Sequence, residues 1–236
     1  MPPLRLTFAS YNIHKGVGLD RRRDPERIVS VLREIDADVI ALQEADRRFG
    51  AREAVIPRDI LDDHSPWMPV APGMRPMSLG WHGNVLLVRR GIEVLDVRAV
   101  ALPTLEPRGA VCAELAVAGR RLRVVGMHLD LSGLRRRHQV RAVCDHLAGC
   151  EGDAPAVMMG DLNEWSRNGG ALGAFDPHHS VLAPGRSFPA RRPFAQLDRI
   201  VVSGEWAVDD IGVHRSTLAA VASDHLPVFA RLALPA

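Results

Sequence analysis

Strand-like segments follow one another closely through the middle of this chain, and their density limits the fold more than any other feature. Between residues 83 and 128 the sequence alternates polar and apolar residues or runs through short apolar stretches, as strands do. We predict strands at 84–89, 92–100, 110–117, 121–128, 5–12, 38–42, 156–159, 198–202, 207–213 and 227–232. So many strands in a chain without a Ser/Gly-rich linker indicate two sheets packed face to face.

Two segments carry helical periodicity instead. Asp24-Pro25-Glu26 has the pattern of a helix start, with an N-cap and a proline at the first helical position, and apolar residues then recur at helical spacing up to Ile35. Residues 132–147 form the second predicted helix. We expect residues 50–82, apart from a short helix around 55–61, and residues 164–196 to be irregular. The pattern predicts an α/β protein with outer helices, in a single domain over 1–236.

The composition of the chain argues against several classes of protein. Three cysteines without a CxxC pair argue against a disulfide framework and a cysteine-bound zinc. The chain starts directly in a strand pattern and has no run of ~20 apolar residues, so we expect a cytoplasmic protein without a transmembrane segment. A formal net charge of +2 does not match tight nucleic-acid binding through charge alone. Lys15 is the sole lysine, which a GC-rich genome explains and which phosphate recognition by arginine also fits.

Two predicted strand ends carry chemically active side chains. Gly160-Asp161-Leu162-Asn163 follows the apolar run 156–159, and Ser223-Asp224-His225 precedes the last strand. A carboxylate for a cation, a base for water and donors for a phosphoryl oxygen suit metal-assisted attack on phosphorus. For an isolated segment, a Gly-Asp turn is the simpler interpretation.

The order of motifs resembles the endonuclease/exonuclease/phosphatase family, over residues 5 to about 232. Eight short motifs occur in sequence: Tyr11-Asn12-Ile13, Gln43-Glu44, Gly83-Asn84, Arg108-Gly109, Met127-His128-Leu129, Gly160-Asp161-Leu162-Asn163, Leu197-Asp198-Arg199-Ile200 and Ser223-Asp224-His225. The resemblance implies a four-layered α/β-sandwich with two mainly antiparallel sheets and outer helices. It also implies a Mg²⁺ or Mn²⁺ cofactor and hydrolysis of a phosphoester.

The resemblance assigns roles by position. Glu44 matches the principal metal ligand, assisted by Asn12 and Asp224. Asp161 and Asn163 match the pair that positions the attacking water and the phosphoryl oxygen. Catalytic roles also pass to His225, to Asp198, which orients it, and to His128. Phosphate contacts are expected from Arg108 and Asn84. His14 stands where repair endonucleases carry an acid, which leaves a second metal-side acid in doubt.

The substrate remains open at this point. A nuclease acting on DNA is the leading interpretation, and phospholipid or inositol-phosphate hydrolysis and a non-catalytic binding module are the alternatives. Trp165, Phe188 and Phe194 could stack on a base, insert beside a lipid or pack, and packing is the default. His138 and His178-His179 lack the spacing of a zinc site.

Overall fold

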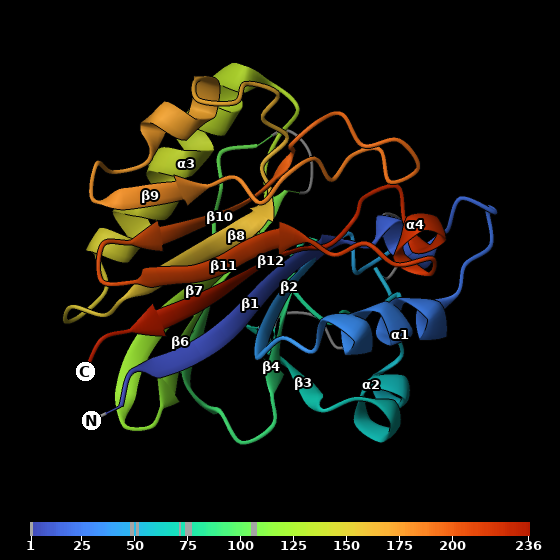
Figure 1. The fold of residues 1–236 in the computed structure, drawn as a ribbon, viewed down its shortest axis with the longest axis horizontal. Coiled ribbons are helices and arrows are strands. Elements are labelled where there is room, and N and C mark those ends of the chain that lie inside the picture. The colour runs from blue at the N-terminus through green and yellow to red at the C-terminus, as the bar shows by residue number, and fades with distance from the viewer. Residues whose placement is uncertain (1, 48–49, 51, 71, 74–76, 105–107) are drawn as a thin grey trace.

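Two six-stranded sheets form the centre of the molecule (Figure 1). The computed structural model describes residues 2–47, 50, 52–70, 72–73, 77–104 and 108–236. The first sheet has the order β11 (Ala207–Val213), β12 (Val228–Leu234), β1 (Leu4–Asn12), β2 (Val39–Gln43), β4 (Val85–Arg89), β3 (Trp67–Val70). The second has the order β5 (Glu93–Val100), β6 (Gly109–Val117), β7 (Arg120–His128), β8 (Ala156–Asp161), β10 (Asp198–Ser203), β9 (His179–Leu182).

Each sheet is antiparallel except for one central pair. β1 and β2 run parallel and are joined through α1 (Pro25–Ile35), while β7 and β8 run parallel and are joined through α3 (Gly133–Ala148). A parallel pair needs such a long crossover, usually a helix. The remaining neighbours are antiparallel, so the expected pair of mainly antiparallel sheets is confirmed.

Helices cover the outer faces of the two sheets. Figure 1 shows α3 outside the second sheet, whereas α1 and α2 (Arg58–His64) lie on the other side of the molecule, outside the first. Three apolar clusters separate the layers: one between the sheets, one under α1 and one under α3. The sheets approach closely at Gly126, where a Cβ atom would lie 2.9 Å from a methyl group of Leu86. The expected four-layered sandwich is confirmed.

Two regions expected to be irregular contain regular elements. Residues 50–82 hold α2, which begins at Arg58 rather than near residue 55, and the edge strand β3. Residues 164–196 hold the 3₁₀ helix η2 (Gly170–Ala174) and the edge strand β9. Both strands are four residues long, and β3 contains Pro69, which edge strands tolerate. These two segments are strands because they pair with β4 and β10, and their own residues do not show a strand pattern. The short helix α4 (Ala219–Ala222) was also not predicted.

Among the described residues, no helix combines the length and apolar character needed to cross a membrane.

Candidate active site

One edge of the double sheet collects every candidate residue. The parallel strands β1, β2, β7 and β8 end at this edge, and the antiparallel strands β4, β6, β10 and β12 begin there. Strand pairing therefore places residues distant in sequence side by side: Asp161 is opposite His128 on β7 and opposite Asp198 on β10. The register thus brings the polar strand ends together at one edge of the sheets.

Asp161 lies at the centre of the group. Its Oδ2 atom accepts a hydrogen bond from Asn12 Nδ2 at 3.0 Å and lies 3.4 Å from His128 Nε2. Its Oδ1 atom accepts from the backbone amide of Asn163 at 2.9 Å. The Asn12 bond crosses from one sheet to the other, so the site depends on both.

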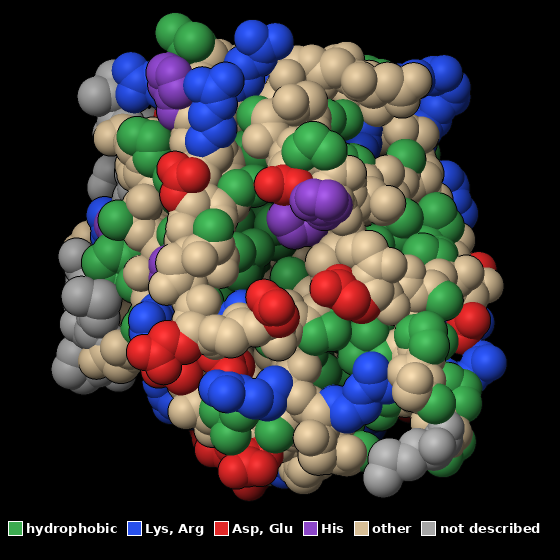
Figure 2. All heavy atoms as spheres, turned by 90° about the vertical axis from the view of Figure 1, so that its left-hand side faces the viewer, with side chains coloured by type: hydrophobic (Ala, Val, Ile, Leu, Met, Phe, Trp, Pro, Cys, Tyr) green, Lys and Arg blue, Asp and Glu red, His purple; other side chains and the backbone are tan. Residues whose placement is uncertain are grey.

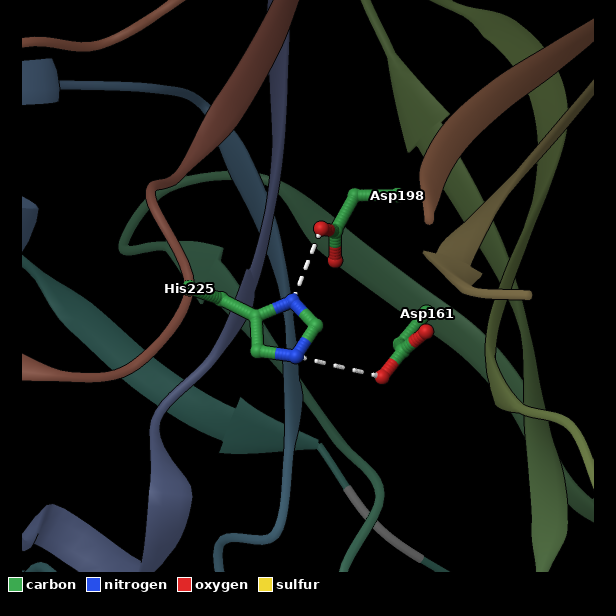
Figure 3. Close-up of side chains that lie close together, drawn as sticks. All are labelled: Asp161, Asp198 and His225. Atoms are coloured by element: carbon green, nitrogen blue, oxygen red, sulfur yellow. Dashed lines mark hydrogen bonds and ion pairs between the residues drawn. The ribbon is translucent and has the colours of Figure 1, made fainter. Parts of the chain in front are cut away.

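His225 lies between two carboxylates (Figure 3). Nδ1 is 2.9 Å from Asp198 Oδ2, and Nε2 is 3.7 Å from Asp161 Oδ2. Burial alone would lower the pKa of His225, but the charges of Asp198 and Asp161 outweigh it and raise the pKa to about 10. The ring is therefore an imidazolium at neutral pH; Nδ1 donates to Asp198, and Nε2 forms an ion pair with Asp161.

The charge of His225 acts in turn on Asp161, where it lowers the pKa. Burial would raise the pKa of its carboxyl group, but the positive charge of His225 and the hydrogen bond with His128 hold that pKa well below its usual range. A carboxylate with so low a pKa stays ionised at neutral pH and is a weak proton acceptor. It is better suited to orienting a water molecule than to removing its proton.

Ser187 completes the support for His225 and was not found from the sequence. Its hydroxyl donates to Asp198 Oδ2, and both residues are fully buried. The other carboxylate oxygen, Oδ1, is buried without a partner among the described residues. A serine in an irregular segment gives no pattern that could have identified it.

The metal-side residues come from three places: Asn12 ends β1, Glu44 follows β2, and Asp224 lies between α4 and β12. The Oε2 atom of Glu44 forms a close ion pair with Lys15 Nζ. Burial would raise the pKa of Glu44, but the positive charge of His128 and the hydrogen bond from Lys15 lower it. Asn12 Oδ1 accepts from the His14 amide at 3.1 Å, and Asp224 Oδ1 lies 3.9 Å from His14 Nδ1.

Two groups of side chains could hold a metal ion. Carboxylate and amide oxygens of Glu44, Asn12 and Asp224 are the hard ligands that Mg²⁺ prefers, and Glu44 already holds a cation, the ammonium of Lys15. Asp161, Asp198 and His225 form the second group, with ligand atoms within 4.8 Å of one another. An ion bound there would have to replace the proton on His225, since an imidazolium has no free lone pair.

The two predicted phosphate contacts differ in their surroundings. The guanidinium of Arg108 contacts His128 Nε2 and so lies beside Asp161. Asn84 is almost fully buried and donates from Nδ2 to the carbonyl groups of Trp81 and His82. Those bonds direct the amide donors of Asn84 towards the 81–84 turn. The structure therefore supports a phosphate contact from Arg108 more strongly than one from Asn84.

Asn163 also uses part of its side chain for structure. Its Nδ2 atom donates to the carbonyl group of Leu129 at 2.9 Å, and its φ is 48°. That bond uses one of the two amide hydrogens, so a single one remains for a phosphoryl oxygen.

Aromatic side chains extend from His225 to the surface. Phe188 lies with its ring centroid 4.7 Å from that of His225, and Trp165 contacts both Phe188 and Phe194, at 6.4 and 6.1 Å. Trp165 is 58% exposed and Phe194 is 60% exposed, so packing does not account for these two rings. Arg167, Arg191 and Arg192 are exposed nearby in the sequence.

Comparisons with known proteins match most of the chain. A model described as "Endonuclease/Exonuclease/phosphatase family" matches residues 9–225. The chain is 27% identical over 245 residues to "Uncharacterized protein YbhP" of Escherichia coli (strain K12), covering 94% of each.

Among solved structures, an endonuclease/exonuclease/phosphatase from Bacteroides vulgatus has a TM-score of 0.77 at 17% identity, covering 98% of this chain and 100% of that one. D. rerio TDP2 complexed with single strand DNA product has a TM-score of 0.74 at 17% identity, covering 97% and 98%. A mannosyl-6-phosphatase of Bacteroides thetaiotaomicron has a TM-score of 0.74 at 19% identity, covering 96% and 99%. Identities this low show a shared fold.

Proposed function

Because this chain belongs to the endonuclease/exonuclease/phosphatase family, we propose that it is a divalent-metal-dependent phosphodiesterase that cleaves nucleic acid, with DNA as the leading substrate. The observation that carries the proposal is the ionised Asp161 held between His128, His225 and Asn12. Such a group can hold a water molecule while cationic and amide donors surround the phosphoryl oxygens.

Each residue has a separate task in this mechanism. The Asp161 carboxylate orients the attacking water in line with the scissile P–O bond. The imidazolium of His225, kept protonated by Asp198, donates to a non-bridging oxygen as negative charge develops. Arg108 and His128 face the phosphate from the other side of Asp161, and Asn163 offers its remaining amide hydrogen. Mg²⁺ or Mn²⁺ held by Glu44, Asn12 and Asp224 would supply Lewis-acid polarisation of the phosphoryl group.

The exposed aromatic rings favour a nucleic acid over a small phosphoester. Bases stack on exposed aromatic side chains whatever their sequence, and adjacent arginines can contact the flanking phosphates. Trp165 and Phe194 provide such a surface, which Phe188 connects to His225, and the exposed Arg191-Arg192 pair precedes Phe194 in the sequence. Binding of a single strand by D. rerio TDP2, which has the same fold, agrees with this choice.

The charge distribution limits how tightly a long duplex could bind. The net charge is only +2. Figure 2 shows the edge opposite the candidate site, where both termini lie, and there too basic and acidic side chains are both present with hydrophobic ones between them. We therefore propose recognition of a short single-stranded segment at the site edge rather than of an extended duplex.

A sugar or inositol phosphate is the second candidate, because the mannosyl-6-phosphatase shares the fold. That substrate would need Arg108 and His128 to bind a terminal phosphate, and the aromatic rings to contact a sugar face. The charged and hydrogen-bonding groups around Asp161 support an enzyme over a binding module.

The test compares hydrolysis of a 5′-labelled single-stranded oligonucleotide, plasmid DNA, bis-p-nitrophenyl phosphate and mannose 6-phosphate, with Mg²⁺, Mn²⁺ or EDTA. Asp161→Asn is the inactive control, because it keeps the shape of the side chain and removes its charge. Metal-dependent cleavage of the oligonucleotide that is lost in the control supports the proposal. Release of phosphate from mannose 6-phosphate without cleavage of either DNA would refute the nuclease assignment and support the second candidate.

A further inference from the structure

Lys15 is the one lysine of a chain with 30 lysine and arginine residues, and its ammonium group lies in the candidate metal site. Nζ contacts Oε2 of Glu44, the predicted principal metal ligand. The side chains of Lys15 and Glu44 are 30% and 23% exposed, so both groups are partly withdrawn from water. An exposed ion pair is usually weak and loosely held, whereas the backbone on both sides of this pair is fixed.

The turn that carries Lys15 has an unusual backbone. His14, Lys15 and Gly16 have φ values of 45°, 55° and 67°, in a region that non-glycine residues seldom adopt. A Cβ atom on Gly16 would lie 2.8 Å from Val55, so the turn packs against its surroundings without room for a larger residue. Conformations of this kind persist only where surrounding contacts enforce them, and they often mark functional sites.

Hydrogen bonds hold this turn in place. Gly16 N donates to the carbonyl of Ile13 at 2.7 Å, and Asp24 N donates to the carbonyl of Gly16 at 2.9 Å. The side chain of Arg23 donates to the carbonyl group of Lys15 itself at 3.2 Å. The fold thus fixes the Lys15 backbone within reach of the Glu44 carboxylate.

Glu44 is held just as closely. Its φ is 56°, and the backbone amide of the next residue donates to the carbonyl group of Gly83 at 2.9 Å. With both backbones held, the contact between the two residues depends on their side chains alone. A divalent cation that approaches Oε2 of Glu44 therefore meets a position already taken by an ammonium group.

We propose that Lys15 is a built-in competitor for the metal site, a tethered cation that neutralises Glu44 and must yield its place to the divalent ion. The inference rests on the proposed function, because it takes Glu44 as the metal ligand. Lys15 thereby sets the concentration at which the site binds metal. A lysine suits this role better than an arginine, because its compact ammonium group on a flexible stem can move aside without breaking a two-point contact.

The size of the effect follows from charge. For a divalent and a univalent cation about 5 Å apart, Coulomb's law gives roughly a tenfold or larger effect on affinity even with the dielectric constant of water. We therefore expect Lys15→Met to tighten Mg²⁺ and Mn²⁺ binding at least about tenfold. Lys15→Arg should not tighten it, because the charge remains and the guanidinium can hold Glu44 at two points.

Isothermal titration calorimetry with MgCl₂ and MnCl₂ alone measures this directly on the full chain, without substrate. Arg22→Met is the matched control, because it removes one positive charge from an exposed side chain further along the same loop. Glu44→Gln identifies the site, since heat that persists in this variant comes from binding elsewhere on the protein.

If Lys15→Met does not fold, ¹³C reductive dimethylation of the wild type gives the second readout. It labels one lysine and the N-terminus and keeps their positive charge.

If Mg²⁺ displaces Lys15 from Glu44, it should shift the dimethyl-lysine resonance in the wild type and leave that resonance unchanged in Glu44→Gln. Metal binding in Lys15→Met could instead be unchanged or weaker and still depend on Glu44. That result would refute the proposal that Lys15 competes with the metal, and it would leave the proposed function intact. Absence of Glu44-dependent binding in the wild type would overturn both.

Discussion

Replacing Asp198 with asparagine isolates the charge that keeps His225 protonated. Asp198 is fully buried, and its Oδ2 atom is 2.9 Å from Nδ1 of the ring. Asparagine has nearly the same shape and can still accept from Nδ1–H through its carbonyl oxygen, so the ring keeps its position. What changes is the electrostatic preference for the imidazolium.

The magnitude follows from the raised pKa. The difference between the ordinary value of 6.5 and about 10 corresponds to roughly 5 kcal/mol in favour of the charged ring. Asp198 is the largest of the favourable contributions, followed by Asp161, and both act against burial. Removing the charge of Asp198 should therefore take away the largest of these contributions and lower the pKa of His225 below the wild-type value.

The sign of the stability effect follows from the same pKa. Because the folded protein binds the His225 proton more tightly than the unfolded chain, this contribution is complete below pH 6.5. It is lost as pH rises towards about 10 in the wild type, and at lower pH in Asp198→Asn. The variant should thus be less stable at neutral pH, and the difference should shrink above pH 9.

NMR of ¹³C-histidine-labelled protein in EDTA measures the pKa, with His225→Gln identifying one signal among ten histidines. Melting temperature across pH 5 to 10 provides the independent check. A wild-type His225 that titrates near 6.5, or a variant that titrates like the wild type, would refute the reasoning.

Three further predictions concern the site and the sheet beneath it. Asp161→Asn should lower kcat by about 10²–10⁴ while near-UV circular dichroism stays native, and parallel losses of activity and folding would contradict it. Trp165→Ala should weaken single-stranded DNA binding by about 1–3 kcal/mol in fluorescence anisotropy, whereas Leu134→Ala, another exposed apolar residue, should not. Gly160→Ala should lower the melting temperature by about 2–12 °C, because its Cβ atom would lie 1.8 Å from the carbonyl oxygen of Met127; an unchanged value in calorimetry would be inconsistent with that contact.

The sequence predicted those parts of the site that strand pairing determines. Asp161, His128 and Asp198 were recognisable because each lies at the end or start of a strand with a clear apolar pattern, and register then brings them together. Lys15 and Ser187 were missed because they reach the site from loops, where no periodicity relates position to direction.

The same limit applies to the fold. The central strands were predicted within a few residues, since their apolar runs are buried on both sides. The edge strands β3 and β9 were missed because four residues beside prolines and histidines carry too little pattern. The side-chain bond from Asn163 to Leu129 likewise depends on a turn geometry that composition does not specify.

The order of strands in the two sheets repeats. In each, a hairpin comes first (β11–β12 or β5–β6), the helix-linked parallel pair lies third and fourth, and the last two strands are placed in reverse chain order. The first sheet differs only in that its hairpin comes from the end of the chain, where Leu234 pairs with Leu4. The two sheets therefore share one strand order, and the halves that build them are related by a circular permutation of the chain.

That topology makes a specific rearrangement feasible. Joining the adjacent termini by a short linker and opening the chain in the turn between β10 and β11 would yield two consecutive halves of identical connectivity. Asn12 and Asp161, 149 positions apart, would then lie at the end of the third strand of one half and at the end of the fourth strand of the other. The catalytic edge is in this sense an interface between two related units carried on one polypeptide.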